Sequence, residues 1–535
     1  MKKIWKSYLA YLIMGGSFML LFVINFKWPN HWLDSDMAAE MISSKLFAEE
    51  GSFLFSKNWC YSTEFRMLYT QLFMSPLFTF ITSWKVIRLI TNIICYILMI
   101  ASYFFMLSKF KVSSFLKVMS AVILLLPFSE TMMTHMQMGN TYMMHVILIF
   151  TAMGLFMQLV DWNENSKKRN AIFLLLYILL MILCGVTGIR YFLALMLPLL
   201  LATILLVLRQ PQWQVLRREI SKTNWIALFK TKAFGYVIIA LEGAAAMLAG
   251  YGINLLYISR QYSFQTYESI NFISIYQGIL GQRLEDSFGS LMMLLGYIPD
   301  RAVLSLRGIA TMAAFLLLGI FIYITMKCIK TCVLEYRFFV MLFLSAMVIN
   351  TLIFVFTNST LVPRYYITVF IFVLPVLIIY FQEEKRPLDK ILVAALLVAA
   401  LALGTGKTVV SYITNDKNEN RYGAVAFLQE EGYEFGYATY WNGNITTELS
   451  NGDIEVANIG DPEYMDFFEW SSKKEYYENN DYQGKVFLLL TVEQAVTHED
   501  TTALQNGNLV YEDSWYKVYT YDSIEAFLSY KEVRE

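Results

Sequence analysis

Two aspartates stand one residue apart near the start of the sequence, at Asp34 and Asp36. A carboxylate can act as a general base and take the proton of an attacking hydroxyl, and a pair of carboxylates can also hold a divalent metal ion. A helix cap beside a solvated acid would explain the same pair without any chemistry. Asp36 directly precedes an apolar periodic run, so it is the expected cap, and Asp34 is the expected base.

A third acidic candidate is Glu130, which begins a polar connection that also contains His135. It could assist the aspartates or simply be an interfacial glutamate at the end of a span, and the sequence favours neither. His135 and His145 are ten residues apart on different predicted elements. We therefore expect them to bond neighbouring helices rather than to bind a metal.

Three arginines, Arg190, Arg307 and Arg364, fall at or near the ends of apolar runs on the predicted outer side. Cations are disfavoured there by the positive-inside rule, and a guanidinium pairs bidentately with phosphate. Snorkelling of each side chain to the interface is the simpler explanation, but three together suggest a site for a lipid phosphate. Lys57 and Arg66, in the first polar connection, are weaker candidates for the same role.

The composition is that of a membrane protein. Hydrophobic residues make up 57% of the 535 residues, charged residues only 16%, and the mean hydropathy is +0.47. Soluble domains are less apolar and richer in charge. The five cysteines form no disulfide or metal-binding pattern.

The apolar runs predict eleven membrane spans with the N-terminus in the cytoplasm, since Lys2, Lys3 and Lys6 precede the first run. Basic clusters then fall on alternate connections, which places the C-terminus outside. The segment 67–83 is apolar enough to insert, but we interpret it as a re-entrant or surface segment broken at Pro76. The predicted spans are residues 8–26, 86–107, 115–129, 141–160, 171–187, 191–208, 233–258, 303–326, 338–357, 365–381 and 390–411.

The first connection outside the membrane, residues 27–84, is long, aromatic and charged. After Asp36, apolar residues recur at helical spacing, which predicts an amphipathic helix on the membrane surface with its polar face in water. These apolar positions are Met37, Met41, Ile42, Leu46 and Phe47.

Residues 412–535 form a second predicted domain after the membrane domain 1–411. They carry 24 acidic and 8 basic residues, which argues against a nucleic acid partner. A helical run at 424–431 and turn signals such as Asn442-Gly443-Asn444 predict a small extracytoplasmic α/β domain. Its predicted strands are residues 435–440, 454–459, 486–490, 509–511 and 516–519.

The layout of one span, a long first outer loop with Asp34-Ser35-Asp36 near its start, and many further spans resembles the GT-C class of glycosyltransferases. This class includes the protein O-mannosyltransferases and the aminoarabinose transferase of lipid A. The resemblance implies an α-helical polytopic fold of about 11–13 transmembrane helices, a polyprenyl-phosphate-linked sugar as donor, and the two aspartates as the acidic motif of the class. The Pro-Pro-Leu run of some members is absent, and only Ser75-Pro76-Leu77 resembles it.

The sequence therefore predicts an inverting glycosyltransferase in the plasma membrane. It would move a sugar from a polyprenyl phosphate to an extracytoplasmic glycan, lipid or protein, with a divalent metal ion as an open possibility. A polysaccharide polymerase or ligase is an alternative that the long segment 259–302 favours. A flippase of lipid-linked sugars is another, for which Glu242 would be the plainest mid-membrane polar residue.

Overall fold

The computed structural model describes residues 2–530, apart from 140–141, 162–165, 267–269, 301, 332 and 479, and apart from the side chains of 2–4, 306 and 307. Contacts between residues divide the chain into two compact units. We call residues 1–23, 94–254 and 269–411 the helical unit, and residues 24–93, 255–268 and 412–535 the α/β unit. The predicted first connection outside the membrane, residues 27–84, which we call the first outer loop, and the C-terminal region, residues 412–535, thus belong to the same unit.

Within the described residues, nine helical runs are long and apolar enough to cross a membrane. Two further helix pairs pass the same test but bend sharply, by 91° and 70°. Counting each bent pair as one span gives eleven, the number predicted, and the chain is a multi-pass membrane protein. The nine runs are α1 (Lys2–Lys27), α4 (Trp84–Met106), α7 (Tyr142–Leu159), α8 (Lys167–Thr187), α12 (Lys232–Ile253), α15 (Leu306–Cys328), α16 (Leu334–Phe356), the run Pro363–Glu383 and α19 (Pro387–Thr414).

The bent pairs coincide with two predicted spans. One is α5 (Ser114–Leu125), followed by α6 (Glu130–Met132) and the π-helix η2 (Met133–Gln137). The other is the π-helix η4 (Phe192–Met196) with α9 (Leu197–Leu208), followed by α10 (Pro211–Arg218). Shorter elements complete the helical unit and the segment that leaves α12: η1 (Leu107–Lys109), α11 (Lys222–Phe229), η5 (Asn254–Ile258), α13 (Ser259–Gln261), η6 (Ile275–Gln277), α14 (Leu280–Leu294), η7 (Pro363–Tyr366), α17 (Ile367–Phe370) and α18 (Val373–Glu383).

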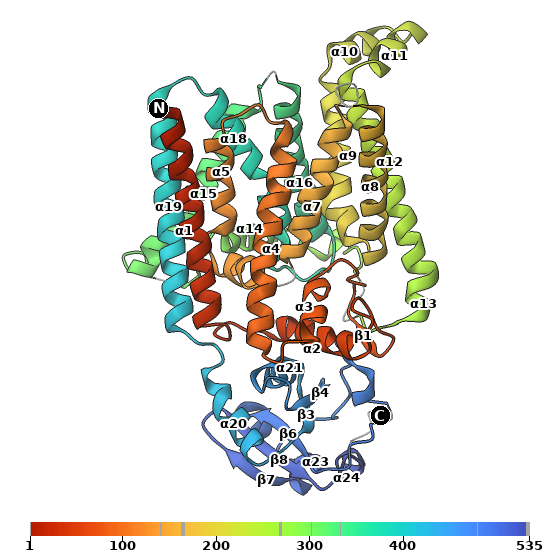
Figure 1. The fold of residues 1–535 in the computed structure, drawn as a ribbon, viewed down its shortest axis with the longest axis vertical. Coiled ribbons are helices and arrows are strands. Elements are labelled where there is room, and N and C mark those ends of the chain that lie inside the picture. The colour runs from red at the N-terminus through yellow and green to blue at the C-terminus, as the bar shows by residue number, and fades with distance from the viewer. Residues whose placement is uncertain are drawn as a thin grey trace. The chain divides into compact units, whose positions relative to one another are not determined.

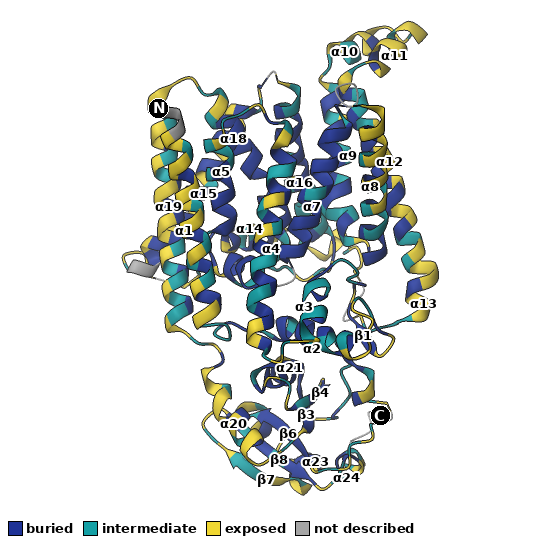
Figure 2. Cartoon of the chain, in the orientation of Figure 1, coloured by how far each residue is buried: buried dark blue, intermediate teal, exposed yellow. Residues whose placement is uncertain are grey.

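Close helix packing organises the helical unit (Figure 1). α7 is buried along almost its whole length, as its dark colour in Figure 2 shows. α8 and α12 approach so closely that a Cβ at Gly185 would lie 2.0 Å from the carbonyl oxygen of Met247. Only glycine fits such a contact, the usual role of small residues between membrane helices.

The first outer loop contains two helices, α2 (Ser35–Glu49) and α3 (Gln71–Phe78). α3 has eight residues, too few to cross a membrane, so the segment 67–83 is not a span, as predicted. The helix continues through Pro76, however, so the predicted break at this proline is wrong. Pro76 is the sixth residue of this short helix, so α3 lacks the one backbone hydrogen bond that an N–H at this position would make.

The predicted exposure of α2 is also wrong. Its polar residues Ser35, Glu40 and Ser44 are as buried as its apolar ones. The reason is that α2 packs against α3 and against α21 (Tyr440–Leu449), which comes from the C-terminal region. Figure 2 shows α2 and α21 largely buried. A helix covered on opposite sides keeps only part of its polar surface in water, here Glu49 and the partly exposed Ser43 and Lys45.

The C-terminal region contains a five-stranded sheet in the order β4-β3-β6-β8-β7. β3, β4 and β6 are parallel, while β8 is antiparallel to both β6 and β7. All five strands lie where the sequence predicts strands, and the predicted helix is α20 (Tyr422–Glu430). The strands are β3 (Phe435–Thr439), β4 (Glu455–Ile459), β6 (Val486–Thr491), β7 (Asn508–Glu512) and β8 (Tyr516–Tyr521).

Both faces of this sheet are buried in apolar clusters. Tyr437 and Leu488 pack on one face against α24 (Ile524–Ser529), and Ala438 and Leu489 pack on the other against α20. A small second sheet joins β1 (Trp59–Tyr61) of the first loop to β2 (Ser263–Phe264) and β5 (Ser472–Lys473). The remaining elements of this region are η8 (Glu419–Arg421), η9 (Lys474–Tyr476), α22 (Val492–Thr497) and α23 (Thr502–Asn506).

The predicted turn at Asn442-Gly443-Asn444 is wrong, since these residues lie inside α21. The asparagine side chains bond to groups of the fold: Asn444 accepts from Asn458 at 3.2 Å. A Cβ at Gly443 would lie 2.5 Å from Oδ1 of Asn458, so the glycine allows α21 to approach β4. Tertiary packing here outweighs the turn preference of the three residues.

Candidate active site

Asp34 is the N-cap of α2. Its backbone is extended, and its Oδ1 accepts a hydrogen bond of 2.9 Å from the N–H of Met37. The predicted assignment of the cap to Asp36 is therefore wrong, because the helix begins at Ser35, two residues before the start that a cap at Asp36 implies. Asp36 lies in the first helical turn, where a negative charge complements the helix dipole.

Asp36 accepts a hydrogen bond of 2.8 Å from the hydroxyl of Tyr440, the first residue of α21. The carbonyl oxygen of Tyr440 in turn accepts a bond of 2.5 Å from the Ser35 hydroxyl. Tyr440 is 7% exposed. Burial, and then the neighbouring Asp36, hold the pKa of Tyr440 well above its ordinary value. The phenol is thus protonated at neutral pH and donates to the carboxylate.

The residues before Asp34 are bonded to the end of α19 and to the chain that follows it. The indole N–H of Trp32 donates to the Asn415 carbonyl at 2.9 Å, and the Asn418 amide donates to the carbonyl of Leu33 at 3.0 Å. His31 Nδ1 lies 2.9 Å from the carbonyl oxygen of Tyr412. Asp34 is therefore positioned from two sides, by α2 and by these bonds.

Arg66 lies beside two buried carboxylates. Its guanidinium is 3.5 Å from Glu40 and 3.6 Å from Glu64, and it also stacks over the Tyr69 ring. Burial raises the pKa of Glu40 to about 7, although Arg66 acts in the opposite direction. Tyr69 and Thr70 also donate to Glu40. Arg66 is thus engaged with carboxylates.

A buried ion pair joins the start of α4 to the end of α21. Arg88 donates to both carboxylate oxygens of Glu448 at 2.7–2.9 Å and to the carbonyl of Met37 at 3.1 Å. Arg88 is 2% exposed and Glu448 is 6% exposed. Through Met37, this pair also contacts the first turns of α2.

The other predicted residue of the α/β unit is Lys57. It is exposed, and its ammonium group lies 3.4 Å from the amide oxygen of Gln261.

In the helical unit, Arg190 lies over two aromatic rings. Its guanidinium carbon is 5.6 Å from the ring centres of both Tyr142 and Tyr365, and it donates to the Tyr142 hydroxyl at 3.0 Å. Arg364 is next to Tyr365 in η7 and is partly exposed. The structure thus brings Arg190 to the element that carries Arg364. The Arg307 side chain lies outside the described residues.

Glu130 is exposed at the N-terminus of α6, whose cap is Ser129. It interacts electrostatically with Lys407 of α19, whose ammonium group donates to the Gly296 carbonyl. His145 is buried and lies 2.6 Å from the hydroxyl of Tyr191. This contact between α7 and Tyr191, the residue that precedes η4, fits the predicted bonding role of the histidine.

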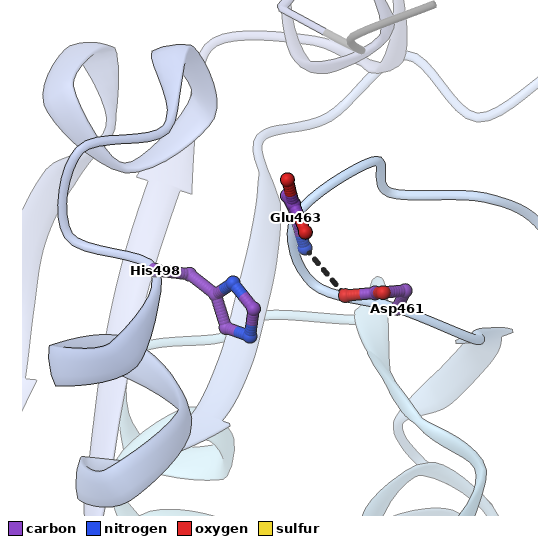
Figure 3. Close-up of side chains that lie close together, drawn as sticks. All are labelled: Asp461, Glu463 and His498. Carbon is purple, nitrogen blue, oxygen red and sulfur yellow. Dashed lines mark hydrogen bonds between the residues drawn. The ribbon is translucent and has the colours of Figure 1, made fainter. Parts of the chain in front are cut away.

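One set of three potential metal ligands occurs among the residues that the structure describes. It consists of Asp461, Glu463 and His498 (Figure 3), whose ligand atoms lie within 4.8 Å of one another. The Asp34–Asp36 pair is not part of a set of this kind in the described chain.

Sequence reasoning missed Tyr440, Glu40, Arg88 and Glu448. Arg88 carried a signal, since it is a cation at the outer end of a predicted span, where cations are disfavoured. No pattern in the sequence marked Tyr440 or Glu448 as part of the site, because each is separated from its partner by more than 350 residues.

No family model matches the sequence, and no curated protein matches it. Solved structures do: ArnT from Cupriavidus metallidurans in the apo state is 10% identical, with a TM-score of 0.54 over 98% of this chain and 99% of that one. ArnT bound to undecaprenyl phosphate is 11% identical, with a TM-score of 0.53 over 99% and 100% of the chains. An oligosaccharyltransferase of Archaeoglobus fulgidus tethered to an acceptor peptide is 11% identical, covering 96% of this chain and 74% of its own, at a TM-score of 0.48.

The chain therefore has the GT-C glycosyltransferase fold over nearly its full length. ArnT, an aminoarabinose transferase, is among the solved proteins that it is similar to. This confirms the fold predicted from the first outer loop and the pattern of spans.

Proposed function

We propose that this protein is an integral-membrane glycosyltransferase that moves a sugar from a polyprenyl-phosphate carrier to an acceptor hydroxyl outside the cytoplasm. The observation that carries the proposal is the placement of Asp34 and Asp36 at the fixed N-terminus of α2, in a chain with the GT-C fold. That ArnT has been solved with undecaprenyl phosphate supports this class of donor.

In the proposed reaction, the acceptor hydroxyl attacks the anomeric carbon of the sugar and its proton passes to the Asp34 carboxylate. The bond from this carbon to the phosphate oxygen breaks, and the polyprenyl phosphate leaves with the electron pair. The sugar passes through an oxocarbenium-like transition state, and a single displacement inverts the anomeric configuration. The cap bond to Met37 uses one of about four acceptor positions of the carboxylate.

Asp36 and Tyr440 are proposed to position Asp34 rather than to react. The phenol holds Asp36, and the bond from Ser35 to the Tyr440 carbonyl holds the first residue of α2 between the aspartates. These bonds fix both the start of the helix and the cap that precedes it. Rigid placement of a base can raise the reaction rate by several orders of magnitude, because the reacting atoms must lie about 3–3.5 Å apart.

Arg190 and Arg364 are the proposed ligands of the carrier phosphate. The rings of Tyr142 and Tyr365 fix the plane of the Arg190 guanidinium, and Arg364 follows from the same element as Tyr365. A planar guanidinium binds phosphate oxygens in pairs and neutralises the charge of the leaving group. Arg66 is less suited, because it already faces Glu40 and Glu64.

The test is transfer by the purified protein in lipid nanodiscs. A panel of radiolabelled polyprenyl-phosphate monosaccharides is supplied with delipidated envelope fractions as acceptors, and incorporation of label is measured. We expect one donor to be consumed and undecaprenyl phosphate to inhibit. Failure of every donor in the panel, together with no binding of undecaprenyl phosphate at micromolar concentration, would contradict the proposal.

A further inference from the structure

Three side chains gather at the end of the five-stranded sheet where the parallel strands β4 and β6 terminate: Asp461, Glu463 and His498. Asp461 and Glu463 follow the carboxyl end of β4, and His498 follows α22, the helix that leaves the carboxyl end of β6. Figure 3 shows the imidazole ring turned towards the loop that carries the two carboxylates. The carboxyl ends of parallel strands are where α/β sheets characteristically bind ligands.

The loop that carries the carboxylates is held by its own backbone. Oδ1 of Asp461 accepts from the N–H of Glu463 at 2.9 Å, and the carbonyl of Asp461 accepts from Met465 at 2.9 Å. A β-bridge between Ile459 and Phe467 closes the loop. The fold therefore fixes the direction in which the Asp461 carboxylate points.

The histidine is fixed in a similar way. The N–H of His498 donates to Gln494 at 3.1 Å, and its carbonyl accepts from both the N–H and the hydroxyl of Thr501. Two rigid segments from different strands thus carry the three side chains. Asp461 and His498 are partly buried, while Glu463 is exposed.

The ligand atoms suit a divalent transition metal. An imidazole nitrogen favours Zn²⁺ and its neighbours in the series, whereas Ca²⁺ and Mg²⁺ prefer sites made of oxygen alone. Two ligands of a tetrahedral Zn²⁺, each bonded at about 2.1 Å, lie about 3.4 Å apart. The three groups lie within 4.8 Å of one another, so movements of about 1.4 Å or less, to which the exposed Glu463 side chain can contribute, bring the ligand atoms to bonding distance.

We propose that Asp461, Glu463 and His498 bind one Zn²⁺-like ion, with water completing its coordination. The ion would join the loop after β4 to the end of α22, on either side of β3. α22 already contacts the end of β3, since Gln494 donates to Thr439 at 3.3 Å. Thr439 directly precedes Tyr440, so the ion would brace the sheet edge from which Tyr440 extends. The proposal does not depend on the transfer reaction.

The test is Zn²⁺ titration of the full-length protein in detergent after removal of metals with EDTA. We expect one equivalent to bind with a micromolar or lower Kd and to raise the Tm. His498→Ala, Asp461→Asn and Glu463→Gln should each raise Kd at least tenfold. Glu499→Gln, which changes the residue next to the histidine, is the matched control and should leave Kd unchanged.

Replacement of Zn²⁺ by Co²⁺ gives a second readout, because visible absorption of the bound Co²⁺ should change with His498→Ala. If His498→Ala or Asp461→Asn unfolds, Glu463→Gln still tests the metal site, because the exposed Glu463 side chain has no role in the core. Binding only at millimolar Zn²⁺, or equal binding by Glu463→Gln and the wild type, would overturn the proposal.

Discussion

The hydroxyl of Tyr440 donates a 2.8 Å hydrogen bond to Asp36 across 404 residues of sequence. It links the C-terminal α/β region to the acidic motif of the first outer loop, and both belong to the same compact unit. The C-terminal region is therefore part of the structure that positions the candidate active site.

Tyr440→Phe removes this hydrogen bond but keeps the ring in place. A hydrogen bond to a charged group contributes about 1.5–3 kcal/mol, so we expect kcat for transfer to fall by about ten- to a hundredfold with KM for the lipid donor little changed. Tyr519→Phe, in β8, is the matched control and should be as active as the wild type. Equal kcat values for Tyr440→Phe and the wild type would remove the positioning role of the phenol.

The Arg88–Glu448 pair should be strongly coupled. Removing one partner of a buried ion pair costs about 3–5 kcal/mol, because the other charge remains buried without compensation. Arg88→Met and Glu448→Leu should each lower the Tm, and the double variant should recover much of the loss. Thermal unfolding in detergent measures this, and losses that simply add in the double variant would rule out the coupling.

Glu40 should make stability depend on pH. Its pKa is raised from 4.5 to about 7 by burial, so between these values the folded chain binds more protons than the unfolded chain. The contribution is present below pH 4.5 and is lost as pH rises through about 7, by up to about 3 kcal/mol. The Tm of the wild type should therefore fall from pH 5 to pH 8 more than that of Glu40→Gln. Parallel Tm curves for the two proteins would contradict the raised pKa.

The orientation of the chain is tested by labelling. The alternation of basic clusters predicts that the C-terminal region lies outside the cytoplasm. A membrane-impermeant maleimide should label Glu431→Cys in intact cells and should label Lys168→Cys only after permeabilisation; both positions are exposed. The opposite pattern would reverse the predicted topology.

The spans and the five strands of the C-terminal sheet could be predicted because both follow from local patterns of apolar residues in the sequence. Strands such as Val486–Thr491 are short runs of apolar residues between turn signals. The helix α2 was also predicted, since its apolar positions recur with helical spacing.

The environment of α2 was not predictable in the same way. Its burial depends on α21, and α21 itself was mistaken for a turn because Asn442, Gly443 and Asn444 favour turns locally. The partners of Asp36 and Arg88 are distant in sequence, and no pattern in one chain pairs residues across such a distance. The candidate site was therefore found by its aspartates, while the groups that position them became visible only in three dimensions.

The proposed role of Asp34 as the general base is tested by the rate of sugar transfer by Asp34→Asn at saturating lipid donor. Asparagine keeps the shape and the capping ability of aspartate but cannot take a proton. Loss of a general base lowers the rate by about 10²–10⁴-fold, so we predict a fall in kcat of this size, with undecaprenyl phosphate still bound and the Tm unchanged. The control is Asp522→Asn, at an exposed position of the same unit, which should retain full activity. Near wild-type turnover by Asp34→Asn would show that Asp34 only caps α2 and would contradict the proposed mechanism.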